Sequence, residues 1–246
     1  MRTLLPLLLA FVAGVALAQT PGRAAAQDAA VQDTAAQQAQ AEGRFIHALG
    51  LAYLGDHAQA AERLAAILAT RPTDPAVHDA LAEAYGALGR AAEARYHAEE
   101  SVRHGGAEPA FRLRLAALQR EAGQARQAIA TLEAALAAAP DMPEVLVALA
   151  ELYQQADDAA GAERVLTRLA QVAETPATRL RLAGLAQGRA AHAEAAGHLE
   201  RAHVLAPDEP AILEALADAL VAAGHADEAR RRLEAYLVRR PGEAGA

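Results

Sequence analysis

A stretch that recurs along the chain, seen most clearly at residues 74–106, constrains the fold more than any other feature. Within it, apolar and small residues follow one another at spacings of three and four on both sides of Gly89. That spacing predicts two amphipathic helices joined by a tight turn. Because an isolated pair of this size buries too little surface to be stable, we expect copies beside it.

The copies form six units, which begin at Ala41, Pro75, Pro109, Pro143, Pro176 and Pro210. The spacing between successive starts is constant, except that the fifth unit begins one position early. Alanine occupies positions 8 and 20 of every unit, and leucine fills positions 7 and 24 in all but one unit each. Position 15, in the turn, is glycine in four units and Asp157 or Ala190 in the other two. An alanine facing an alanine lets helix axes approach closely, while the leucines fill the space around them.

This pattern resembles the tetratricopeptide repeat family, whose 34-residue helix-turn-helix units carry the same phased small residues, glycine and proline. The resemblance covers roughly residues 41–241. It implies an all-α fold, a right-handed solenoid of about six helix-turn-helix repeats. Composition favours helices too, because the apolar content is largely Ala and Leu and β-branched residues are scarce. We expect no strands.

Residues 1–18 have the pattern of a secretory signal peptide. Arg2 precedes an uncharged run over residues 4–17, and the small residues Ala16 and Ala18 predict cleavage before Gln19. An uncleaved membrane anchor is the alternative, because the run is near the lower limit for a bilayer span. No cysteine follows the run, which argues against a lipid anchor. We therefore expect a periplasmic or secreted protein with no membrane insertion after cleavage.

Residues 19–40 are rich in Ala and Gln and have almost no large apolar side chain, so we expect a disordered linker; a solvent-facing helix is the alternative. The solenoid then covers 41–241, and 242–246 form a tail. In the first unit Tyr53 lies two residues before Gly55 rather than four, which predicts a shifted or frayed first helix. The missing residue near Glu174 predicts either a hinge or a tolerated loop deletion.

No catalytic, metal or cofactor pattern is present in the sequence. The chain has no Cys, one Ser and no glycine-rich loop after a strand. Two His-x-Glu triplets lack the downstream cysteine pair that a zinc deaminase needs, and His192, His198 and His203 are spaced by six and five, which does not place them on one helical face. A net charge of −8 argues against nucleic-acid binding and against adhesion to acidic membranes. We expect a protein without enzymatic activity, cofactor or metal.

In the family that the chain resembles, first helices line a concave groove through positions 2, 5, 9, 12 and 13. Carried over by register, the groove residues are Leu49, Asp79, Glu83, Leu113, Arg120, Glu121, Glu144, Val147, Glu151, Leu180, Glu214 and Asp218. The groove is then acidic with apolar spots, and Arg120 is its only base. This favours a basic or amphipathic protein segment as ligand; a solvated face with no ligand is the alternative. Members that grip a C-terminal carboxylate use Lys, Arg and Asn, and this chain has no Lys or Asn.

The chain continues past the last repeat without the solvating helix that ends most such arrays. Leu233, Tyr236 and Leu237 are then uncovered and predict a patch for a partner or for self-association, unless Tyr236 and the arginine stems shield it. Together these features indicate a non-enzymatic scaffold of the bacterial cell envelope that binds an envelope or secretion protein. The alternative is a module that binds an envelope polysaccharide or assists polymer export, which the aromatic content of 3% disfavours. A hydrolase is the third possibility, against which the missing nucleophiles stand.

Overall fold

The structure is a computed structural model that describes residues 38–239. The predicted signal peptide, the linker up to residue 37 and the tail lie outside the described residues. Every regular element of the described part is a helix, and no strand occurs between residues 38 and 239. The prediction of an all-α chain is confirmed.

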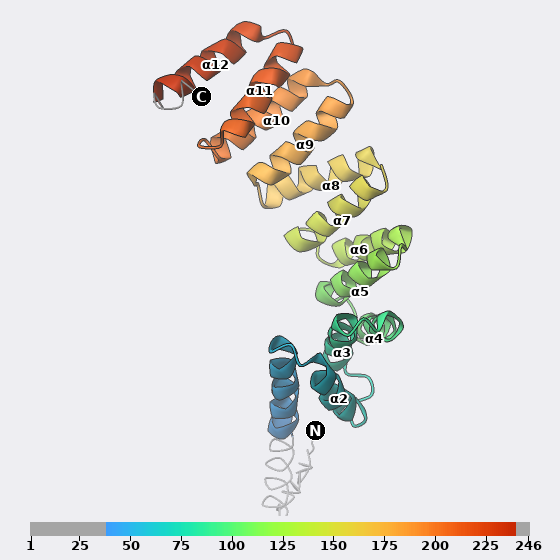
Figure 1. Cartoon of the computed structure of the whole chain (residues 1–246). Helices are drawn as coiled ribbons and strands as arrows, with labels where there is room; N and C mark the ends of the chain where they lie inside the picture. Colours follow the sequence, from blue (N-terminus) through green and yellow to red (C-terminus); the bar gives the residue numbers. More distant parts are fainter. Residues whose placement is uncertain (1–37, 240–246) are drawn as a thin grey trace, which may run out of the picture. The chain divides into compact units, whose positions relative to one another are not determined.

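The helices follow one another in pairs, and from α2 on each packs against the next along the chain (Figure 1). A first helix covers residues 38–53 of the described part. The others are α2 (His57–Leu68), α3 (Pro75–Ala87), α4 (Ala91–His104), α5 (Pro109–Glu121), α6 (Ala125–Ala138), α7 (Pro143–Gln155), α8 (Ala159–Val172), α9 (Pro176–Gly188), α10 (His192–Leu205), α11 (Pro210–Ala222) and α12 (Ala226–Arg239). The array is therefore a solenoid of helical repeats.

The helices begin where the register places them. From the second repeat on, the first helix of each repeat starts with proline at position 1 and has 13 residues. Proline suits this site because its fixed φ is helical and the first turn does not use its missing N–H. Side chains cap some of these helices: Asp74 accepts hydrogen bonds from the N–H groups of Ala76 and Val77, and Thr175 accepts one from Thr178.

Position 15 is left-handed in all six repeats. Four of these residues are glycines, with φ between +70° at Gly89 and +85° at Gly55. The two replacements keep the same conformation, with φ of +54° at Asp157 and +57° at Ala190. The substitutions therefore leave the turn unchanged, although a side chain makes this conformation less favourable.

Alanine columns lie at the centre of the array. The alanines at positions 8 and 20 are at most 7% exposed in every repeat. Large leucines surround them, and Leu64, Leu132, Leu149 and Leu166 are completely buried. One continuous cluster of buried residues runs from α5 to α9 and a second runs from α9 to α12. The alanine columns are therefore buried between the helices, where the register places them.

The first repeat and the short junction between α8 and α9 bear on local predictions made from the sequence. The first helix ends at residue 53, which is position 13 as in the other repeats, so a shifted or frayed end is wrong; Gly55, not the position of the tyrosine, determines where the helix stops. The same helix includes residues 38–40, which the sequence assigned to the linker. At the short junction, α8 and α9 share one buried cluster that includes Leu182, so packing continues across the deleted position.

Candidate functional site

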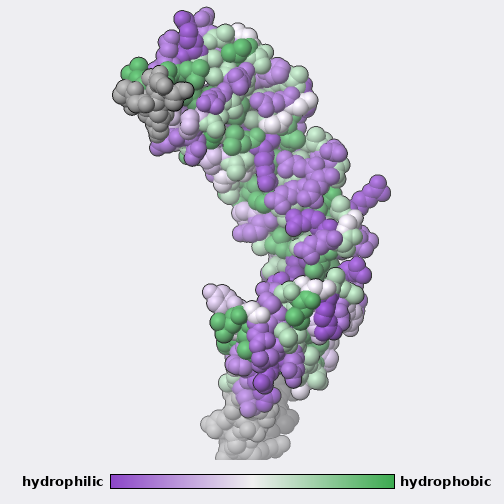
Figure 2. All heavy atoms as spheres, viewed as in Figure 1, coloured by the Kyte–Doolittle hydropathy of each residue, from purple (hydrophilic) through white to green (hydrophobic). Residues whose placement is uncertain are grey.

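The twelve residues assigned to the groove lie on the first helices of their repeats, and we call this surface the first-helix face. Nine of them are exposed, while Asp79, Leu113 and Glu151 are partly buried. The apolar members are accessible to a ligand, with Leu49, Val147 and Leu180 between 36% and 40% exposed. On the side that Figure 2 presents, hydrophobic side chains gather in small areas between hydrophilic ones and do not form one band.

The centre of this face is hollowed into a cleft of about 240 Å³ between α5 and α7. Its lining consists of Leu113, Ala116, Ala117, Arg120, Leu132, Glu144, Val147, Ala148, Glu151 and Leu152. The floor is apolar, and the charged side chains of Arg120, Glu144 and Glu151 border it. The structure thus brings five of the twelve predicted residues together in one open cleft, which has room for side chains of a bound segment.

Arginines of neighbouring repeats pair with several carboxylates of the first-helix face. Arg114 on α5 donates from Nε to Asp79 at 2.6 Å and from Nη2 to Glu83 at 3.0 Å, both on α3. On α7, Glu151 lies 3.4 Å from Arg120 of α5 and 3.6 Å from Arg181 of α9. Partial burial lowers the pKa of Arg114, but its bond to Asp79 and the nearby carboxylate charges outweigh this and raise it overall.

Sequence reasoning missed Arg114 and Arg181. Both occupy position 6, which the family register does not assign to the groove, so Arg120 was taken as the only base. A signal was present, because arginine recurs at position 6 in the third and fifth repeats. A residue there faces positions 5 and 9 of the preceding repeat, where Asp79, Glu83 and Glu151 lie.

The pairing leaves the free charge of the face negative. Among the described residues, Glu121, Glu144, Glu214 and Asp218 have no ion-pair partner, whereas Arg114, Arg120 and Arg181 are all paired. Glu144 is the free carboxylate that borders the cleft. The acidic character predicted for the groove is therefore concentrated in four side chains.

The predicted C-terminal patch surrounds a second cleft of about 270 Å³, lined by Pro210, Leu213, Glu214, Leu233, Tyr236 and Leu237. Leu233 is 36% exposed, whereas the leucine at the same position is at most 2% exposed in the first, third, fourth and fifth repeats. Leu237 is 41% exposed. Tyr236 is only 8% exposed and belongs to the buried cluster of the last repeats, so it forms the base of the patch and not its surface.

The described residues contain neither a metal-binding cluster nor a helix that could span a membrane. No group of three or more His, Asp or Glu side chains within residues 38–239 is arranged to hold a metal ion. In the same part of the chain, no helix combines the length and the apolar character needed to span a bilayer.

Comparison with known proteins identifies a family for part of the repeat array. Residues 119–183 match the model of a family described as tetratricopeptide repeat. No curated protein matches the sequence.

Solved structures match over most of the chain. A tetratricopeptide repeat protein from Parabacteroides merdae has a TM-score of 0.60 and 21% identity, covering 80% of this chain and 79% of its own. PilF from Pseudomonas aeruginosa has a TM-score of 0.61 and 16% identity, covering 85% and 95%. YrrB, described as a tetratricopeptide protein with an unusual peptide-binding site, has a TM-score of 0.58 and 14% identity, covering 70% and 89%. Residues 119–183 are therefore of the tetratricopeptide repeat family, and the helical array on either side of them has the fold of tetratricopeptide repeat proteins.

Proposed function

We propose that this chain is a non-enzymatic scaffold that binds a basic, amphipathic segment of another protein on its first-helix face. The cleft between α5 and α7 carries the proposal, because it joins an apolar floor to the free carboxylate of Glu144. An aliphatic side chain of the ligand fits the floor, while an adjacent Lys or Arg pairs with Glu144. Tetratricopeptide repeat proteins are generally non-catalytic scaffolds, which supports a binding role.

The cell envelope is the proposed location. The support is the signal-peptide pattern of residues 1–18, with cleavage after Ala18. The partner is then an envelope or secretion protein. A peptide-binding site is described for YrrB, which has the same fold and lends general support to peptide capture.

The test is capture of partners from an envelope extract by the chain from Gln19 to Ala246. A cleft variant carries Glu144→Gln with Val147→Ser, which removes the free charge and makes the floor polar. The control carries Glu62→Gln with Val204→Ser, a similar pair of exposed side chains on the second helices α2 and α10. Asp79, Glu83 and Glu151 are unsuitable targets, because their removal leaves paired arginines without partners.

We expect the parent and the control to retain the same protein, and the cleft variant to lose it. Capture should weaken as salt rises, because exposed charges are screened. Partners that persist with the cleft variant would place binding elsewhere on the molecule. Capture of an envelope polymer and no protein would favour the alternative of a polymer-binding module.

The patch on α12 is a second proposed contact, through which two chains associate. Its support is the exposure of Leu233 at a position that following repeats bury elsewhere. Sedimentation at rising concentration tests this, with Leu233→Glu on the patch and Val238→Glu, which is 82% exposed on another side of α12, as control. A monomer at every concentration would rule the association out.

A further inference from the structure

Two repeats place a histidine of the second helix against a base of the first helix. In the second repeat, Nδ1 of His78 on α3 lies 2.9 Å from Nδ1 of His97 on α4. In the fifth repeat, Nη1 of Arg179 on α9 lies 3.3 Å from Nδ1 of His198 on α10. Both pairs join positions 4 and 23 of their repeats, and no other repeat has histidine at position 23.

Hydrogen-bond chemistry determines where the protons lie in the second repeat. His78 is 3% exposed, and its Nε2 lies 3.1 Å from the carbonyl oxygen of Pro72. A carbonyl only accepts, so Nε2 of His78 donates and its Nδ1 accepts from Nδ1–H of His97. The pair tolerates one added proton, on Nε2 of His97. A second proton sets two N–H groups against each other and breaks the bond.

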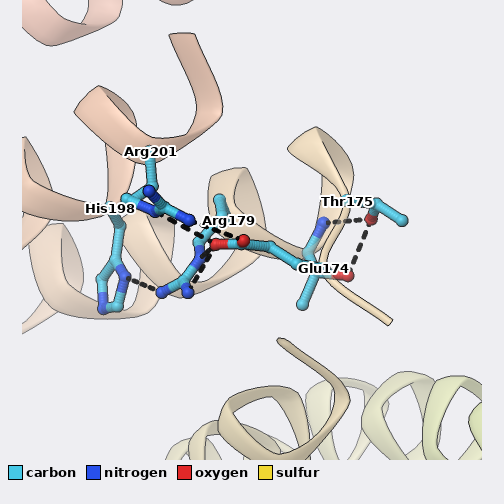
Figure 3. A network of polar contacts seen from close by, with 6 residues as sticks. Glu174, Thr175, Arg179, His198 and Arg201 are labelled. Carbon is cyan, nitrogen blue, oxygen red and sulfur yellow. Dashed lines mark hydrogen bonds and ion pairs between the residues drawn. The ribbon is translucent and has the colours of Figure 1, made fainter. Parts of the chain in front are cut away.

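In the fifth repeat an arginine takes the place of the first-helix histidine (Figure 3). Glu174, in the loop before α9, accepts from Nε of Arg179 and from Nη2 of Arg201, each at 2.7 Å. The bond to Glu174 helps hold the guanidinium of Arg179, whose Nη1 then donates to Nδ1 of His198. This bond needs the lone pair of a neutral imidazole. Protonation of His198 replaces it with repulsion between two cations.

The surroundings of His97 favour its neutral form. Burial and then the nearby His78 lower its pKa, and the carboxylates of Glu100 and Glu93 on its own helix oppose them only in part. The ring of Tyr85 on α3 stacks on His97 with centroids 5.5 Å apart. Among the described residues, α2 and α5 contribute no ion pair or hydrogen bond to this imidazole.

His198 is held neutral in the same way. Burial and then Arg179 lower its pKa, Arg189 adds to the decrease, and Glu194 and Glu163 oppose it. Of these, Glu163 belongs to α8 and Arg189 to the turn after α9. Within the described chain, α11 contributes no hydrogen bond or ion pair to His198.

We propose that two hydrogen bonds are acid-sensitive latches between paired helices. The bond between His78 and His97 in the second repeat is released when both imidazoles are protonated, and the bond between Arg179 and His198 in the fifth repeat is released when His198 is protonated. The second-repeat latch acts next to the first-helix face, because Asp79 follows His78 directly on α3. Acid would then loosen that part of the binding surface. Only this last consequence depends on the proposed function; the latches themselves do not.

The sign of the effect follows from the lowered pKa values. The unfolded chain takes up protons at an ordinary histidine pKa of about 6.5, before the folded chain does. The latches therefore stabilise the fold fully above that pH, and the stabilisation is lost as pH falls toward the folded pKa. Carboxylates titrate near pH 4, so a comparison of about pH 7.5 with about pH 5.5 isolates the histidines.

The experiment measures the urea midpoint of the full chain at these two pH values. We expect the midpoint of the parent to decrease on acidification, and most of that decrease to disappear in the double variant His97→Gln with His198→Gln. The control is His225→Gln, which changes an exposed histidine and should keep the decrease. A double variant that loses as much stability as the parent would overturn the proposal.

A titration of the parent chain by NMR keeps the test decisive if the double variant does not fold. The imidazole signals of His97 and His198 should titrate below the ordinary histidine pKa of about 6.5; midpoints at or above that value would also overturn the latches. Neither measurement involves a partner. Failure of the latches therefore appears in stability and titration, and failure of the scaffold function appears in capture at about pH 7.5.

Discussion

The fourth and fifth repeats share a backbone plan but join their two helices by different means. In both, the first helix has 13 residues and the second 14. At positions 4 and 23 the fourth repeat has Leu146 and Val165, at most 4% exposed. The fifth repeat has Arg179 and His198 there, hydrogen-bonded to each other. The alanines at positions 8 and 20 are buried in both, so these small residues determine the helix spacing and the sites around them can be apolar or polar.

The two repeats also differ in the size of other buried side chains. Position 11 is Tyr153 in the fourth repeat and Ala186 in the fifth, and position 27 is Leu169 and Ala202. All four are buried. The fifth repeat thus has smaller buried side chains, and it adds the ion pairs of Glu174 with Arg179 and Arg201. Ion pairs that stay partly exposed, as these do, contribute less to stability than buried apolar side chains.

Among the substitutions that test this comparison, we expect the largest loss of stability at Leu146. Leu146→Ala opens a cavity in a fully buried site and should destabilise the fold by about 2–5 kcal/mol. The partly exposed Arg179, when changed to Ala, should cost clearly less. Urea unfolding followed by circular dichroism measures both. Equal losses would mean that the polar network replaces the apolar contact fully.

A smaller loss of stability is expected at the buried alanines that the two repeats share. Ala150→Leu and Ala183→Leu each insert a large side chain between close helices at position 8, where both alanines are at most 1% exposed. Each should destabilise by roughly 1–3 kcal/mol. We expect similar values in the two repeats, measured in the same way. A fifth repeat that tolerates the leucine would show that its smaller side chains leave room at this position.

The fold could be predicted from the sequence, because the same pattern of residues recurs in every repeat. The columns of Ala, Leu, Gly and Pro gave the register, and the helices begin and end accordingly. The sequence predicted which helices carry the candidate groove residues and that their charge is mostly negative, but not which of the carboxylates are paired. Arg114 and Arg181 were missed because their partners lie on the preceding repeat, a relation between helices that the pattern within one unit does not contain.

The histidine pairs were missed for a related reason. His97 and His198 were judged by spacing along the chain, which tests for a metal site on one helix face. Their actual partners, His78 and Arg179, lie 19 residues earlier on the paired helix. Comparing position 4 with position 23 in every unit would have found both pairs.

The smallest change in stability is expected at the turns of the fourth and fifth repeats. Ala190 and Asp157 hold the left-handed conformation at position 15 of the fifth and fourth repeats. This conformation costs roughly 1–2 kcal/mol for most side chains but less for Asp, whose short polar side chain bonds locally. Ala190→Gly removes that cost and adds the entropy loss of glycine, about 0.5–1 kcal/mol, so a net gain on the order of 0.5–1 kcal/mol is expected. Asp157→Gly should gain less. Urea midpoints of the two variants measure the difference, and a larger gain at Asp157 would show that its side chain does not support the turn.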